Sequence, residues 1–274
     1  MPYRYLSVRR DGPVEHVVLN RPDVRNAFNE QVIADLTAWA AAAHSDAGLR
    51  VVVLSGAGKV FSAGADAAWM AKMAGYSHAE NVADATAAAK MFHAINTVPA
   101  IVIGRIHGAA LGGGSGLAAV CDIVVADSSA VFGFTETKLG ILPAMISPYV
   151  LQKITPSAAR ELFLTGMRFD AARAREIGLV HAVVPAAELD AAVQHYVNES
   201  LSASPTGVAA AKALIPRVWG QRPGDVMAIT AEAIAAQRVS PEGQEGLKAF
   251  LAKAKPSWVI ESRVGSRESG DGDR

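Results

Sequence analysis

Short apolar segments rich in β-branched residues alternate with longer segments of helical periodicity over the first two thirds of the chain. Apolar side chains between Asn29 and Ala43 recur on one helical face, and Asn29 is a suitable N-cap for that helix. A second helix is expected from His78 to Ile95. Strands that alternate with helices indicate an α/β fold with parallel strand pairing. The expected strands are Leu6 to Arg9, Val14 to Leu19, Val51 to Leu54, Ala100 to Gly104, Ile123 to Ala126 and Leu179 to Val184.

The pattern changes after residue 186. From Ala187 to Lys253 the chain is rich in alanine and lacks strand signals, and prolines interrupt it at intervals. We expect three or four helices in this part. The final stretch, Glu261 to Arg274, is rich in glycine, serine and charged residues and is expected to fray.

The composition narrows the class of protein. Of 274 residues, 51% are hydrophobic and 19% are charged, which favours a globular chain with a sizeable core. Lys plus Arg and Asp plus Glu both number 26, so no basic excess is present to bind a nucleic-acid backbone. No apolar run approaches the ~20 residues that span a bilayer, and the single cysteine, Cys121, fits a reducing compartment. We therefore expect a cytoplasmic protein with no nucleic-acid or membrane partner, and the seven histidines show no metal-ligand spacing.

Two turns rich in glycine and alanine follow expected strands. Phe61 to Asp66 follows the strand that ends at Leu54, and Ala109 to Gly116 follows the strand that ends at Gly104. Each turn leads into an expected helix, whose first N–H groups are free to bind a ligand. Two such amides, one from each turn, would stabilise a developing oxyanion if they converged. The same composition is also typical of tight turns and close helix packing, and the residues alone leave both interpretations open.

Glu136 is the candidate for proton transfer. It lies in Phe132 to Gly140, among apolar and small residues. Such surroundings raise the pKa of a carboxyl group, as a general acid or base requires. A surface glutamate beside Lys138, or one that caps a turn, is the alternative.

Several segments occur together in the order typical of one family. They are Leu19 to Pro22, Arg25 to Phe28, Phe61 to Asp66, His107 to Ala118, Phe132 to Pro143 and Glu245 to Leu251. On these segments the chain resembles the crotonase superfamily of enoyl-CoA hydratases and isomerases over nearly its full length. The resemblance implies a spiral core of ββα units in residues 1–200 and a helical trimerisation region in 201–260, and the composition of 261–274 indicates a disordered tail. It also implies an acyl-CoA thioester substrate, no cofactor beyond that coenzyme A, and a homo-oligomer that is a trimer or a dimer of trimers.

The resemblance assigns roles to individual positions. Ala65 and Gly113 match the two residues whose backbone amides bind the thioester oxygen, and Glu136 matches the second of the family's two catalytic glutamates. The positions that match coenzyme A contacts are Arg25, Ala27, Ala63 and Asp66, with Ala63 and Asp66 on the turn that holds the adenine end. Phe250 and Lys253 match an aromatic residue and a lysine that reach the coenzyme A of a neighbouring subunit, and helix packing and a solvated lysine are the alternative.

One position departs from the family pattern. Gly116 stands where typical hydratases carry their first catalytic glutamate, at a position expected to face the substrate. With Glu136 alone, the resemblance implies either hydration of a 2-enoyl-CoA or transfer of a proton between C2 and C4, which is isomerisation. The segment from Glu136 to Val150 resembles hydratases of the methylglutaconyl-CoA type, so we expect hydration of a branched or carboxylated substrate. The alternatives are an isomerase and a non-catalytic or RNA-associated paralogue.

Overall fold

The structure is a computed structural model that describes residues 3–259. The chain divides into two compact units, Met1–Val197 and Asn198–Arg274. The tail expected at residues 261–274 lies outside the described residues.

A six-stranded sheet organises the first unit, with the strand order β1-β2-β3-β4-β6-β9. β1 and β2 are antiparallel and the other neighbouring strands are parallel, as expected for an α/β fold. All six expected strands are present, but the last begins at Ala182 instead of Leu179, because the amides of Leu179 and Val180 both donate to the carbonyl of Ala174 in a turn. The strands are Leu6–Asp11, Val14–Leu19, Val51–Gly56, Ile101–Ile106, Ile123–Asp127 and Ala182–Val184.

A second, three-stranded sheet was not predicted. It contains β5 (Ala109–Leu111), β7 (Val131–Gly133) and β8 (Arg168–Asp170). Each strand has three residues, which is too short to produce a recognisable alternation of apolar and polar positions. β5 forms the first three residues of the second glycine-rich turn, Ala109 to Gly116.

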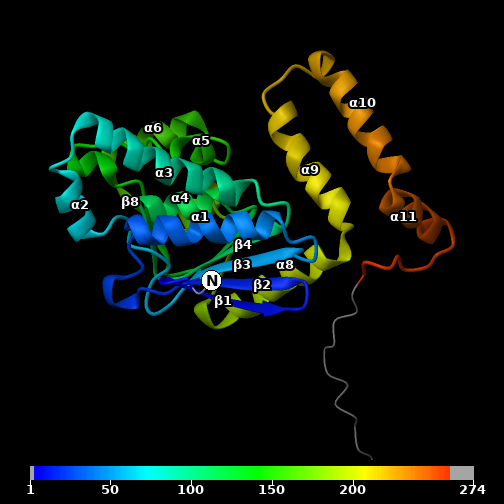
Figure 1. Ribbon diagram of the computed structural model, residues 1–274, viewed down its shortest axis with the longest axis horizontal. Coiled ribbons are helices and arrows are strands. Elements are labelled where there is room, and N and C mark those ends of the chain that lie inside the picture. The colour runs from blue at the N-terminus through cyan, green and yellow to red at the C-terminus, as the bar shows by residue number, and fades with distance from the viewer. Residues whose placement is uncertain (1–2, 260–274) are drawn as a thin grey trace, which may run out of the picture. The chain divides into compact units, whose positions relative to one another are not determined.

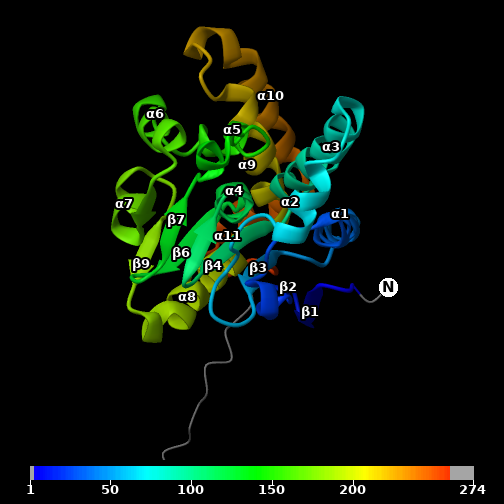
Figure 2. The ribbon, with the colours of Figure 1, turned by 90° about the vertical axis from the view of Figure 1, so that its left-hand side faces the viewer.

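Helices cover the large sheet. α1 (Glu30–His44) and α3 (His78–Asn96) confirm the two predicted helices, and the Asn29 side chain accepts a hydrogen bond from the Val32 amide at 3.0 Å, as an N-cap does. α1, α3 and α4 lie on the same side of the sheet (Figure 1, Figure 2), and the core between them includes fully buried Trp39. The remaining helices of this unit are α2 (Ala67–Met73), α4 (Gly113–Val120), α5 (Ser147–Val150), α6 (Pro156–Thr165) and α7 (Ala171–Glu176), and short 3-10 helices span Pro22–Val24 (η1), Glu136–Leu139 (η2) and Ala186–Glu188 (η3).

The part of the chain after residue 186 is helical, as predicted. Its helices are α8 (Leu189–Ser202), α9 (Pro205–Val218), α10 (Pro223–Val239) and α11 (Pro241–Leu251). Within the second unit, the Glu242 carboxylate joins α11 to the start of α9, since it accepts hydrogen bonds from the amide and hydroxyl of Thr206 at 3.0 and 2.8 Å. Among the described residues, no helix is both long and apolar enough to cross a bilayer.

Candidate active site

The two glycine-rich turns lie side by side in the first unit. Ser62 and Ala110 form a parallel β-bridge, in which the Leu111 amide donates to the Ser62 carbonyl at 3.0 Å. Gly64 has a φ of +93°, and a Cβ at this position would lie 2.9 Å from the Leu111 carbonyl oxygen. Gly112 has a φ of +50° and lies opposite Gly64. Only glycine combines this backbone conformation with so close an approach, so these glycines set the spacing of the two turns.

Each turn presents an unpaired backbone amide. Ala65 follows Gly64, and Gly113 is the first residue of α4, where N–H groups have no partner within the helix. Within the described part of the chain, neither amide donates a hydrogen bond. The strand-like pairing of Phe28 with Ala65 holds the first amide in place, because the Asp66 amide donates to the Phe28 carbonyl at 2.8 Å. We call the Ala65 and Gly113 N–H groups the amide pair.

Glu136 lies beside the amide pair. It follows β7 as the first residue of η2, and its Oε1 lies 3.4 Å from the position that a Cβ on Gly112 would take. Its other oxygen, Oε2, is buried and has no hydrogen-bond partner among the described residues. Burial raises the pKa of this carboxyl group, which confirms the expectation from sequence.

These groups line one cavity of about 260 Å³. Ala65, Gly113 and Glu136 all contribute to its wall, as does Ala63. Side chains of α2 and α3 and the segment from Leu139 to Ile146 complete a wall that is mostly apolar. An acyl chain fits such surroundings, and a carboxylate and two free amides at one end supply the polar groups that fix its orientation.

Gly116 does not line this cavity. A Cβ at this position would lie 2.1 Å from Cγ2 of Ile146 and 3.2 Å from Cε1 of Phe92, and both of these side chains line the cavity. The expectation that Gly116 contacts the substrate is corrected accordingly, because Ile146 separates it from the cavity. The space that a first glutamate would take is filled with apolar atoms.

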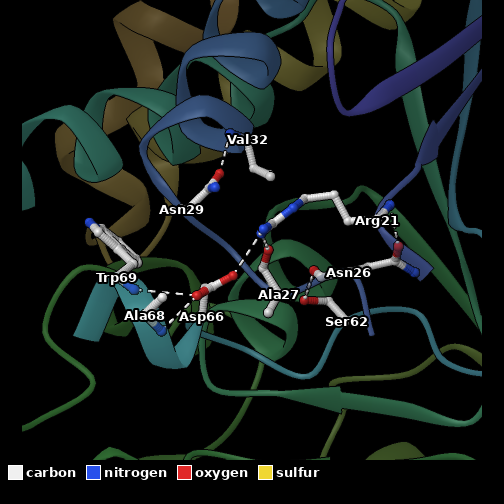
Figure 3. Close-up of polar contacts among 9 residues, drawn as sticks. All are labelled: Arg21, Asn26, Ala27, Asn29, Val32, Ser62, Asp66, Ala68 and Trp69. Carbon is white, nitrogen blue, oxygen red and sulfur yellow. Dashed lines mark hydrogen bonds and ion pairs between the residues drawn. The ribbon is translucent and has the colours of Figure 1, made fainter. Parts of the chain in front are cut away.

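The Asp66 side chain stabilises the fold of this region. Its Oδ1 accepts hydrogen bonds from the amides of Ala68 and Trp69 at the start of α2, and its Oδ2 pairs with the Arg21 guanidinium at 3.0 Å (Figure 3). Burial alone would raise the pKa of the Asp66 carboxyl, but the hydrogen bonds from Trp69, Arg21 and Ala68 outweigh burial and lower it. Both side-chain oxygens are engaged by the protein's own donors, and binding of the adenine end by the turn that carries Ala63 and Asp66 stays a prediction.

Asn26 and Arg21 organise the loops around the first turn, a role that the sequence alone did not indicate. The Asn26 side chain accepts from the Arg21 amide at 2.9 Å and donates to the carbonyls of Ala57 and Val60 at 2.8 and 2.9 Å. Figure 3 shows the Ser62 hydroxyl donating to the Asn26 carbonyl, at 2.9 Å. Asn26 is 1% exposed with a φ of +54°, a conformation that asparagine tolerates better than most residues.

The other positions matched to coenzyme A contacts differ in exposure. Arg25 is exposed, and within the described residues its side chain forms no ion pair or hydrogen bond, while its carbonyl accepts from the Ala63 amide at 2.9 Å. Ala27 is buried, and its carbonyl accepts from the Arg21 guanidinium at 2.7 Å. The second unit carries Phe250, which is 81% exposed, and Lys253, with a φ of +53°. Contact of these residues with coenzyme A stays a prediction.

Asp66→Ala is expected to lower the free energy of unfolding by at least about 3 kcal/mol, because it removes a helix cap and the carboxylate partner of the half-buried Arg21 guanidinium. Urea denaturation measures the change. Asp23→Ala is the matched control, because Asp23 is exposed in η1, and it is expected to change stability by less than about 0.5 kcal/mol. Unchanged stability with a large loss of coenzyme A affinity would show that the Asp66 side chain binds coenzyme A and does not stabilise the fold.

A family model described as enoyl-CoA hydratase/isomerase matches residues 9–261. The chain belongs to the enoyl-CoA hydratase/isomerase family. An enoyl-CoA hydratase from Shewanella pealeana has a similar structure, with a TM-score of 0.90 and 39% identity over 93% of this chain and 96% of that one. AtuE from Pseudomonas aeruginosa has a TM-score of 0.90 and 34% identity, over 94% of this chain and 100% of its own. Crotonyl-CoA hydratase from Syntrophomonas wolfei is 30% identical over 94% of this chain and 99% of its own length.

Membership in the enoyl-CoA hydratase/isomerase family confirms the crotonase fold and the expectation of an enzyme. The activity of this enzyme is of the enoyl-CoA hydratase/isomerase kind, and an acyl-CoA substrate is consistent with the family. The likeness to hydratases of the methylglutaconyl-CoA type stays a prediction. Most residues of the apolar wall were not singled out from sequence, and Ile146 and Asp84 are among them.

Proposed function

We propose that this enzyme adds water to a 2-enoyl-CoA thioester, with the Ala65 and Gly113 amides binding the thioester oxygen and Glu136 moving the proton. The observation that carries the proposal is the buried, unpartnered Oε2 of Glu136 in the same cavity as the amide pair. A buried acceptor with no partner is costly in the free enzyme. A water molecule held for attack would supply the missing hydrogen bond.

The chemistry balances with a single carboxylate. The water O–H bond breaks as Glu136 accepts the proton, and the water oxygen forms a bond to C3 of the substrate. Negative charge moves to the thioester oxygen, where each amide contributes on the order of ~3 kcal/mol of transition-state stabilisation. Glu136 then returns the proton to C2, so the net change is addition of one water across the double bond.

The acyl group that suits the cavity is uncharged and is straight or branched. Methionine, phenylalanine and alanine side chains of α2 and α3 form much of the wall, and among the described residues no lysine, arginine or histidine lines it. A branched acyl chain gains from burial against these side chains. This favours the branched substrates of the sequence prediction over the carboxylated ones.

Isomerisation is the second candidate, favoured by the packing around Gly116. Ile146 and Phe92 occupy the place of a second carboxylate, and a second polar group there would help to hold water. With the same amide pair, Glu136 alone is sufficient to carry a proton from C4 to C2 of a 3-enoyl-CoA.

Three substrates separate these activities. Purified enzyme is mixed with crotonyl-CoA, methylglutaconyl-CoA and a 3-enoyl-CoA, and absorbance is followed at the conjugated enoyl-thioester band. Loss of the band with crotonyl-CoA or methylglutaconyl-CoA supports hydration. Appearance of the band from the 3-enoyl-CoA, with no loss from the other two, would replace hydration by isomerisation.

The pH dependence of the reaction follows from the ionisation of Glu136. Only the carboxylate accepts a proton from water, so kcat falls as pH decreases through its pKa, which burial raises above the ordinary glutamate value. Stability changes with pH in the opposite direction to kcat. A carboxyl with a raised pKa in the folded state destabilises the fold as pH rises from the ordinary value through the raised one. Wild type should therefore lose stability relative to Glu136→Gln across that window, as thermal denaturation at a series of pH values will measure.

We also infer a homo-oligomer, a trimer or a dimer of trimers, in which Phe250 and Lys253 reach the coenzyme A of a neighbouring subunit. Large apolar side chains of the second unit support this inference, since Trp219, Phe250 and Leu251 are 65%, 81% and 81% exposed. Light scattering measures the assembly, and a monomer at micromolar concentration would contradict it.

A further inference from the structure

A second carboxylate lines the cavity, from a different element than Glu136. Asp84 lies in α3 and is half-buried. Its Oδ1 accepts a hydrogen bond from the indole Nε1 of Trp69 at 3.3 Å, and Trp69 is itself 7% exposed. Within the described residues, no hydrogen bond engages Oδ2 of Asp84. Oδ1 of Asp84 is thus held by Trp69, and Oδ2 is available to solvent or to a ligand in the cavity.

No cation of the described cavity wall neutralises the negative charge of Asp84. Burial is the largest cause of the raised pKa of Asp84, and the hydrogen bond from Trp69 lowers this pKa. Glu30 raises the same pKa, while Lys72, which is paired with Glu30, lowers it. Asp84 and Glu136 are therefore the charged groups of a cavity wall in which no described residue is cationic.

We propose that Asp84 is a specificity-determining residue that excludes acyl groups ending in a carboxylate and leaves the cavity to uncharged ones. The inference rests on the proposed function in so far as the cavity receives the acyl group. A carboxylated acyl chain would bring a third negative charge into a small, mostly apolar space that already holds two. Like charges beside an apolar wall repel more strongly than in bulk water because the wall screens them less. Exclusion of a wrong substrate by an unfavourable charge is a common source of specificity.

Turnover tests this with one pair of substrates. Wild type and Asp84→Asn are assayed at pH 8 with 2-pentenoyl-CoA and with glutaconyl-CoA, which has the same chain length and a terminal carboxylate. Wild type should prefer the uncharged substrate in kcat/KM by at least tenfold. Asp84→Asn should reduce that preference at least tenfold, mainly by improving glutaconyl-CoA, with the value for 2-pentenoyl-CoA within about threefold of wild type. An unchanged preference in Asp84→Asn would overturn the proposal.

Two control variants separate charge from packing. Asp84→Glu keeps the charge and should keep the wild-type preference. Trp69→Phe removes the indole donor and leaves the carboxylate, so it should also disfavour glutaconyl-CoA. If Trp69→Phe lost the preference as Asp84→Asn does, the shape of the wall and not its charge would be the cause.

Binding of saturated acyl-CoAs distinguishes failure of this inference from failure of the proposed reaction. Calorimetry compares the Kd of pentanoyl-CoA with that of glutaryl-CoA for wild type and Asp84→Asn, and no turnover is needed. At least tenfold weaker binding of glutaryl-CoA to wild type, relieved in Asp84→Asn, supports the role of Asp84 even if no hydration is found. Equal binding of the two ligands to wild type would reject the role of Asp84, whatever the reaction.

Discussion

Glu136→Gln is expected to lower kcat by about a thousandfold, the middle of the range that positioned general acid–base groups provide. Glutamine has nearly the same shape as glutamate but cannot take a proton from water or return one to C2. The amide pair is unchanged by this substitution, so acyl-CoA binding should be preserved. The measurement is turnover of crotonyl-CoA together with the Kd of a saturated acyl-CoA.

The control for this variant is Glu188→Gln. Glu188 is exposed in η3 and does not line the cavity, so the activity of Glu188→Gln should equal that of wild type. Circular dichroism confirms that both variants are folded. Full activity in folded Glu136→Gln would remove Glu136 from the mechanism and leave the amide pair as the only catalytic element.

Gly116→Glu is expected to lower the free energy of unfolding by at least about 3 kcal/mol and not to create a two-carboxylate hydratase. A Cβ at this position already lies 2.1 Å from Cγ2 of Ile146, so the side chain must displace a packed core residue. Its carboxylate would also be buried among apolar atoms without a counter-charge. Urea denaturation and crotonyl-CoA turnover measure the two effects.

Smaller substitutions isolate the effect of side-chain packing on the free energy of unfolding. Gly116→Ala combined with Ile146→Ala should be less destabilising than the sum of the single variants by about 1 kcal/mol or more, because the second change makes room for the first. Gly224→Ala is the matched control, since a Cβ there meets nothing within 4 Å, and it should leave stability unchanged or slightly raised. Additive effects at positions 116 and 146 would mean that the core adjusts around the new methyl group.

Much of the fold was accessible from sequence because the relevant signals are local. The Asn29 cap and the six strands of the large sheet depend on residue types within a few positions of each other. The raised pKa of Glu136 also followed from its apolar neighbours in the chain. The two glycine-rich turns pointed to an oxyanion site, although sequence alone could not exclude close helix packing.

The remaining features depend on contacts between residues distant in sequence. Ile146 fills the space beside Gly116 from 30 positions along the chain, so no local pattern reports it. The pairing of Asp66 with Arg21 spans 45 residues, so no local pattern predicts that this carboxylate stabilises the fold. Asp84 lies within a long alanine-rich helix, where a single carboxylate is ordinary unless its position relative to the cavity is known.

The two bridges that join Phe28 to Ala65 and Ser62 to Ala110 have a consequence for how this enzyme tolerates change. In the proposed mechanism the groups that bind the thioester oxygen belong to the main chain, so any residue except proline at position 65 would supply the same donor. Substitution at position 65 can therefore alter the lining of the cavity while the amide pair is retained. One added carbon at Gly64, by contrast, would force the two loops apart and remove both donors together.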